Sequence, residues 1–184
     1  RLLEEAGCVS ISAGIESGNE DFRKRVIHSM MSNEKIIEAF RILKKTKMQI
    51  SGNSIIGFPG ETRELIFDTI ELNRKLNLDN IMIHVFNPYR GTSLYDISVE
   101  KGYIPPDHMA GDYRADFTLN MPQIAKEEIL GLQRTFNMYV KFPKEMWPEI
   151  EIAEKFDEEG NKKFLELSEI YKERYLERPL KYLM

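Results

Sequence analysis

The amino-acid sequence repeats one pattern three times: a short strand-like stretch, a turn, and a segment with helical spacing. The strand-like stretches run from Val9 to Glu16, from Gln49 to Phe58 and from Asn80 to Asn87. In the first, apolar residues at every second position predict a strand with two different faces. Successive strands lie ~35 residues apart, the size of a βαβ unit. The pattern therefore predicts an α/β fold on a parallel sheet, open or closed into a barrel.

Helices are predicted after each strand-like stretch. They cover Glu20 to Ile27, Asn33 to Lys47 with Ser32 as N-cap, and a segment from the N-cap Thr62 to Leu76. Apolar residues recur three and four positions apart in the last two segments, which is typical of helices that bury one face.

Beyond about Tyr103 the strand–helix pattern stops. The stretch 105–111 reads as a loop, a helix follows that ends near Pro143, and a last helix runs from Asn161 to Leu176. Trp147 is expected to hold this helical tail on the α/β part. We therefore divide the chain into residues 1–103, the α/β part, and residues 104–184, a helical extension.

Composition excludes several classes of function. The 184 residues carry 26 basic and 30 acidic side chains, a net charge of -4, so nothing predicts a nucleic-acid surface. No apolar run approaches the ~20 residues of a membrane span. Cys8 is the only cysteine, which excludes an internal disulfide and predicts a cytoplasmic location. The chain starts without Met, in a stretch typical of the end of a helix, and we expect a fragment of a longer protein.

The strand-like stretches carry polar side chains on one face. Two interpretations stand side by side: the face lines a lumen that holds a bound molecule, or it is solvated on an edge of the sheet. The residues concerned are Ser10, Ser12, Gly14 and Glu16 in the first stretch, Gln49, Ser51 and Asn53 in the second, and His84 in the third.

Two motifs stand where strands end. In Gly-Ile-Glu-Ser-Gly-Asn, residues 14–19, a carboxylate follows the strand and could accept hydrogen bonds from ribose hydroxyls, while the glycines allow close backbone approach. Gly-Phe-Pro-Gly-Glu-Thr, residues 57–62, is a stiff turn into a helix and could also be an anion site at a helix N-terminus.

In their order and spacing these motifs resemble the second half of the radical S-adenosylmethionine (radical SAM) domain. The resemblance runs from Arg1 to about Tyr103 and is closest to the branch often associated with a cobalamin-binding domain. It is carried by Gly-Ile-Glu-Ser-Gly-Asn (14–19), Asn-Glu-Lys-Ile-Ile-Glu-Ala-Phe (33–40), Ile-Gly-Phe-Pro-Gly-Glu-Thr (56–62) and Pro-Tyr-Arg-Gly-Thr-Ser-Leu-Tyr (88–95). It implies the C-terminal half of a partial TIM-type (βα)6 barrel, followed by the α-helical tail.

The resemblance also implies roles for single residues in binding S-adenosylmethionine. Glu16, with Ser17 beside it, would reach the ribose or the methionine part. Ser29 stands where relatives often have Arg, so Arg23 or Arg25 would pair with the methionine carboxylate, and Arg23 is our choice. The remaining cofactor residues are Asn53 in the lumen, Ile55, Ile56 and Gly57 along the adenine, and Asn87 and Pro88 closing the adenine side.

The family holds a [4Fe-4S] cluster through three cysteines spaced Cys-x3-Cys-x2-Cys, and this chain has Cys8 alone, which we expect to be buried. The resemblance implies a parent enzyme of the oxidoreductase or methyltransferase type that cleaves S-adenosylmethionine to a 5′-deoxyadenosyl radical. We expect this chain by itself to be inactive and to bind no cofactor tightly, whether S-adenosylmethionine, the cluster or cobalamin. Its partners would be a small-molecule substrate and the N-terminal half of the same protein.

No residue is assigned to catalysis from the sequence. His84 is a candidate that faces the substrate, and the three histidines show no metal-ligand spacing, so no metal site is predicted. Two alternatives stay open. One is a non-catalytic α/β module that binds a nucleotide-like ligand or a protein partner, and the other is an enzyme that uses Glu16 as general acid or base with His84.

Overall fold

A parallel three-stranded sheet forms the centre of the molecule. The computed structural model describes residues 2–111 and 117–176. Its strands are β1 (Ser10–Glu16), β2 (Gln49–Ile56) and β3 (Asn80–Val85), hydrogen-bonded in the order β1-β2-β3 with every pair parallel. This confirms the predicted α/β class and its βα units, with strand bounds within two residues of those expected. Closure into a barrel stays a prediction.

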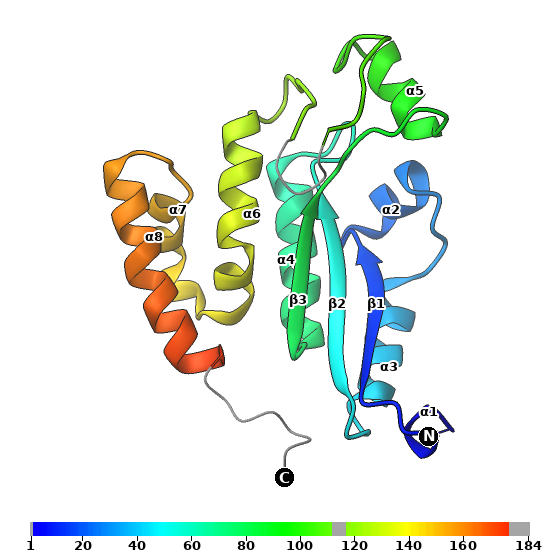
Figure 1. The fold of residues 1–184 in the computed structure, drawn as a ribbon, viewed down its shortest axis with the longest axis vertical. Helices are drawn as coiled ribbons and strands as arrows, with labels where there is room; N and C mark the ends of the chain where they lie inside the picture. The colour runs from blue at the N-terminus through cyan, green and yellow to red at the C-terminus, as the bar shows by residue number, and fades with distance from the viewer. Residues whose placement is uncertain (1, 112–116, 177–184) are drawn as a thin grey trace.

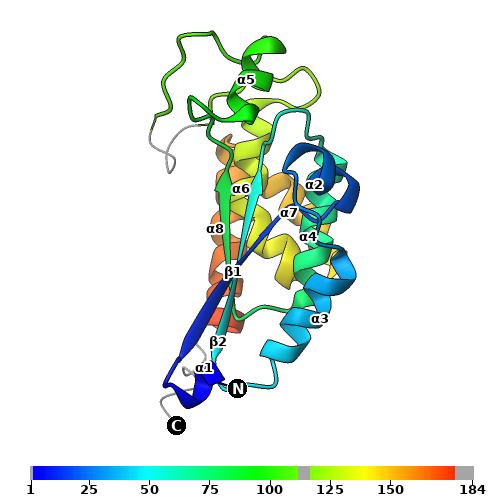
Figure 2. The same ribbon diagram turned by 90° about the vertical axis from the view of Figure 1, so that its right-hand side faces the viewer.

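The helices that follow β1 and β2 cover one face of this sheet. They are α2 (Glu20–Val26), α3 (Asn33–Leu43) and α4 (Arg63–Leu76), and Figures 1 and 2 show all three on the same side. Among the described residues no helix lies on the opposite face, which is bare below the α5 region in Figure 2. We call that uncovered side the open face.

Hydrophobic burial explains why the helices choose their side. Along β2, every second residue is buried, and Ile50 and Ile56 are part of the core. From α4, Ile66 and Ile70 are fully buried against the sheet. Burial of each such side chain stabilises the fold by roughly 1.5–3 kcal/mol. The polar alternate positions are left on the open face.

The tail packs beside the sheet. Helix α5 (Ser93–Glu100) still belongs to the part before residue 104. The tail consists of α6 (Lys126–Lys141), the 3-10 turn η1 (Lys144–Met146), α7 (Trp147–Ala153), α8 (Glu158–Tyr171) and the π-helical turn η2 (Lys172–Leu176). Helix α6 contacts α4 and β3, and α7 and α8 pack on its far side (Figure 1). Trp147 makes edge contacts with Phe67 of α4 and Tyr139 of α6, with ring centroids 5.4 Å apart in both pairs. This confirms that Trp147 holds the tail in place.

Some local expectations need correction. Helix α3 ends at Leu43 and not at Lys47, because the chain turns there toward β2. The short helices α5 and α7 were not predicted. Cys8 is partly exposed instead of buried, and its thiol donates to the carbonyl of Ser10 at 3.1 Å. None of the described helices is long and apolar enough to cross a membrane. The boundary near residue 103 stays a prediction, since one hydrophobic cluster contains residues from both sides of it.

Candidate functional site

The open face carries rows of polar side chains that the strand register brings side by side. Ser12, Ser51 and Asn80 form one row, and Gly14, Asn53 and Met82 form the next. The Asn53 amide donates to the Ser12 hydroxyl at 3.0 Å. Its Oδ1 is buried and accepts no hydrogen bond. A buried acceptor without a donor costs free energy. A hydrogen-bond donor from a bound molecule at Asn53 Oδ1 would remove this cost.

Glu16 ends β1 and turns its carboxylate back over the open face. Its backbone is left-handed, with φ 63°, and the register shifts between Gly14 and Glu16. One carboxylate oxygen lies so close to Gly14 that a Cβ at that position would overlap it. Burial raises the pKa of Glu16, and the nearby charge of His84 opposes this effect. The left-handed conformation costs a non-glycine residue roughly 1–2 kcal/mol, and strain of this kind is common at ligand sites.

His84 lies on β3 next to this carboxylate. It pairs in register with Ile55, and both side chains are half-buried on the open face. The structure thus brings together Glu16, Asn53, Ile55 and His84, four of the residues singled out in the sequence. No group of three metal-ligating side chains occurs within residues 2–111 and 117–176.

The second half of the Gly-Ile-Glu-Ser-Gly-Asn motif faces the helices instead. Gly18 donates its N–H to the Thr69 hydroxyl at 2.8 Å and lies directly against the α4 backbone. Asn19 caps α2 by accepting from the Phe22 N–H at 2.8 Å, and it donates to Asp68 at 2.8 Å. Gly18 and Asn19 therefore fix where β1 ends, which determines where Glu16 lies.

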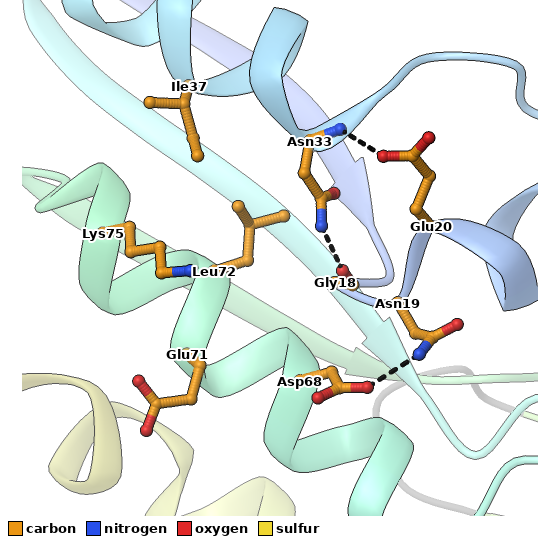
Figure 3. A pocket seen from close by; sticks show the side chains of 9 residues that line it. All are labelled: Gly18, Asn19, Glu20, Asn33, Ile37, Asp68, Glu71, Leu72 and Lys75. Carbon is orange, nitrogen blue, oxygen red and sulfur yellow. Dashed lines mark hydrogen bonds between the residues drawn. The ribbon is translucent and has the colours of Figure 1, made fainter.

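A cavity of about 280 Å³ borders this loop on the helical side (Figure 3). Several of its polar groups bond to one another: Asn33 donates to the Gly18 carbonyl at 2.8 Å and to Glu20 at 2.9 Å, and Asn19 donates to Asp68. None of the predicted cofactor residues lines it. The cavity is separate from the open face.

Arg23 does not lie where a methionine carboxylate could reach it. Its side chain is 1% exposed, and it donates to the carbonyls of Ser17 and Met31 and to the side chain of Asn33. The geometry therefore argues against the predicted role for Arg23. Ser17 is also completely buried, and its hydroxyl has no partner.

The three residues predicted to lie along the adenine, Ile55, Ile56 and Gly57, differ in what they offer to a ligand. Ile55 presents its side chain to the open face, whereas Ile56 is fully buried toward the helices and its carbonyl accepts from Phe86 at 2.8 Å. The N–H of Gly57 donates to Glu61 at 2.6 Å. Ile55 alone of the three predicted residues offers a side chain to a ligand on this face.

Glu61 is a buried acid that the sequence interpretation did not single out. Its Oε2 accepts from the N–H groups of Gly57 and Phe58, while its Oε1 is buried without a partner. Burial raises its pKa to about 8, and the two backbone hydrogen bonds oppose that rise. Glu61 closes the turn after β2. The motif Gly-Phe-Pro-Gly-Glu-Thr contained the signal, since a carboxylate that follows a tight turn often bonds the turn's own N–H groups.

Asn87 and Pro88 follow β3 at the same end of the sheet, and both are buried. The Asn87 amide donates to the Gly111 carbonyl at 3.1 Å, and its Oδ1 is buried without a partner. Arg90 and Tyr95 hold the adjoining loop by donating to the carbonyls of Pro106 and His108. The end of β3 therefore supplies a second unpaired amide oxygen.

Glu16, Ile55, His84 and Asn87 thus lie toward the carboxyl ends of parallel strands, and comparison with known proteins indicates a family. Residues 1–73 match the model of the radical SAM superfamily. Residues 1–73, the first part of the chain, therefore belong to the radical SAM superfamily. An uncharacterized methyltransferase of Pyrococcus horikoshii is 27% identical over 160 residues, 87% of this chain and 34% of that protein.

Two further relatives are named for other reactions. A tRNA-2-methylthio-N(6)-dimethylallyladenosine synthase of Vibrio parahaemolyticus is 29% identical over 128 residues, 67% of this chain and 22% of that protein. A biotin synthase of Caldicellulosiruptor bescii is 31% identical over 99 residues, 54% of this chain and 28% of that protein. The chain spans about a third or less of these relatives' lengths.

Proposed function

We propose that this chain is part of a radical SAM enzyme and forms the side of the site that holds S-adenosylmethionine and faces the substrate. The observation that carries the proposal is the convergence of Glu16, Asn53 and His84 on the open face, at the strand ends of a radical SAM chain. The relatives are named for different reactions, so they support a shared cofactor more than any one product. We propose that the parent enzyme is of the methyltransferase or oxidoreductase type. More specifically, we propose that it belongs to the branch associated with a cobalamin-binding domain.

The residues present fit S-adenosylmethionine. The buried amide oxygens of Asn53 and Asn87 lack donors, and both could accept from its amino or hydroxyl groups. The Glu16 carboxylate would accept from ribose hydroxyls or the ammonium group, bonds that a charged acceptor strengthens. Ile55 would offer apolar contact to the adenine, and His84 would face the substrate. When bound and cleaved by one electron from the cluster of the parent enzyme, S-adenosylmethionine would give methionine and a 5′-deoxyadenosyl radical that removes hydrogen from substrate.

The residues do not fit a [4Fe-4S] cluster. Such a cluster in this family needs three thiolates, and this chain has Cys8 alone. Cys8 precedes β1, at the end of the sheet opposite to Glu16, and its thiol bonds the Ser10 carbonyl. We therefore propose that the cluster is held by cysteines outside these 184 residues and that this chain alone is inactive.

Substitution of Glu16 by Gln in the whole protein tests the proposal. We expect the anaerobic protein, given S-adenosylmethionine and dithionite, to form 5′-deoxyadenosine, measured by chromatography and mass spectrometry. Glu16→Gln should slow this formation about tenfold or more, because losing a hydrogen bond to a charged group costs roughly 1.5–3 kcal/mol.

The matched control is Glu34→Gln, which changes an exposed carboxylate on α3 and should leave the rate unchanged. Equal rates for wild type and Glu16→Gln would remove Glu16 from the site. A whole protein that binds adenosine compounds but forms no 5′-deoxyadenosine would instead favour a non-catalytic nucleotide-binding module.

A further inference from the structure

Arg23 is the largest fully buried side chain in the described part of the protein. It extends from α2 into the space between the end of β1 and the start of α3. Its Nη1 donates to the Ser17 carbonyl at 2.5 Å, and its Nη2 donates to the Met31 carbonyl at 2.6 Å and to Asn33 Oδ1 at 2.8 Å. Nε reaches the Met31 carbonyl as well, at 3.2 Å.

This guanidinium has no carboxylate partner within ion-pair distance among the described residues. Burial lowers the pKa of Arg23, and the charge of Glu20 only partly opposes that effect. Burying a charge among neutral acceptors costs free energy, so the burial of Arg23 calls for an explanation. The groups to which the guanidinium donates provide it.

The connected groups surround the peptide that follows Glu16. Ser17, whose carbonyl Arg23 holds, is the next residue after Glu16. Asn33 accepts from Arg23 and donates through Nδ2 to the Gly18 carbonyl at 2.8 Å, so both carbonyls after Glu16 are tied to one network. Glu16 itself has the left-handed backbone that aims its carboxylate over Gly14. A left-handed glutamate persists only where its surroundings fix the backbone.

We propose that Arg23 is a positioning residue for the cofactor site: by holding the Ser17 carbonyl against Met31 and Asn33, it fixes the backbone that aims the Glu16 carboxylate over the open face. This inference rests on the proposed function for the role of Glu16. It replaces the sequence-based expectation that Arg23 pairs with the methionine carboxylate. Arg23 acts through Glu16 and touches neither cofactor nor substrate.

The test follows the Glu16 carboxylate in the full chain labelled with 13C at the glutamate side chains. Its resonance is assigned with Glu16→Gln. In Arg23→Lys the charge stays, but one ammonium cannot reach three acceptors. We expect Glu16 to swing toward solvent and its pKa to fall from its raised value toward 4.5. Arg25→Lys is the matched control, because Arg25 is exposed on the same helix and should change nothing.

A purely structural role gives a different result. Arg23→Lys would then lower the melting temperature while the Glu16 titration stayed as in wild type, and that result would overturn the inference. Where Arg23→Lys does not fold, Asn33→Ala decides, because it removes one acceptor of Arg23 and the bond to the Gly18 carbonyl. We expect a smaller fall in the Glu16 pKa, and an unchanged titration would overturn the inference.

S-adenosylhomocysteine separates this inference from the proposed function. Weaker binding in Arg23→Lys, together with the altered Glu16 titration, supports both. Absence of binding to wild type contradicts the proposed function, whereas the Glu16 titration still decides whether Arg23 positions this carboxylate.

Discussion

Replacing Gly18 with Ala is expected to lower the free energy of unfolding by about 3 kcal/mol or more. A methyl group at this position would overlap the backbone carbonyl of Asp68 and the Cα of Thr69 in α4. Backbone atoms inside a helix cannot move aside as a flexible side chain can. The loop would have to leave α4 and would lose the bond from Gly18 N–H to the Thr69 hydroxyl. Urea unfolding followed by circular dichroism measures the effect.

Gly14→Ala is the matched control for Gly18→Ala. Its methyl group would meet only the end of the flexible Glu16 side chain. We expect a stability change within about 0.5 kcal/mol, typical of an exposed position. The Glu16 carboxylate would be displaced, so this variant should lose the raised Glu16 pKa without unfolding. Equal destabilisation by the two substitutions would contradict the assignment of Gly18 to packing and Gly14 to the site.

The second large effect concerns Glu61 and pH. Its pKa rises on folding from 4.5 to about 8 because it is buried. A carboxyl group with a raised pKa contributes its full stability below the unfolded pKa and loses it as pH rises through the folded pKa. Wild type should therefore lose stability relative to Glu61→Gln between pH 4.5 and about pH 8. The full difference is about 5 kcal/mol, at ~1.4 kcal/mol per pKa unit.

Glu61→Gln is suited to this comparison because its amide imitates the protonated acid. Its oxygen can still accept from the N–H groups of Gly57 and Phe58. Glu64→Gln serves as the control: Glu64 is exposed and its pKa is lowered, so its effect should appear only as pH falls through the acid range. A stability difference between wild type and Glu61→Gln that does not vary with pH would show that Glu61 stays ionised.

The sequence was sufficient for the features that depend on periodicity. Alternation along β1 and β2 predicted the strands and the polar face, because side chains alternate strictly between the two faces of a sheet. It also placed Glu16 and Asn53 on that face. It did not predict the left-handed backbone of Glu16, because a register shift depends on what the neighbouring strand and loop require.

The burial of Arg23 and Glu61 could not be predicted from the sequence, because it too depends on tertiary contacts. In Arg23-Lys24-Arg25 three basic residues follow one another, and only the acceptors that the fold places near α2, such as the carbonyls of Ser17 and Met31, decide which is buried. Glu61 looks like an ordinary turn residue, and its surroundings include residues distant in sequence, such as Gln123, which donates to the Glu61 carbonyl at 3.0 Å. Charged side chains are usually exposed, so both burials run against the general expectation.

We propose that the open face forms one side of an S-adenosylmethionine site. The most direct test is a titration of the 15N-labelled chain with S-adenosylhomocysteine, followed by amide chemical shifts. We predict weak binding, with a Kd of about 1 mM, or roughly 4 kcal/mol, since this chain supplies only part of the site. Shifts should concentrate at Glu16, Asn53, Ile55, His84 and Asn87 and should be lost in Glu16→Gln. Shifts confined to the helical side, around the cavity of Figure 3, or no shifts at all, would contradict the claim.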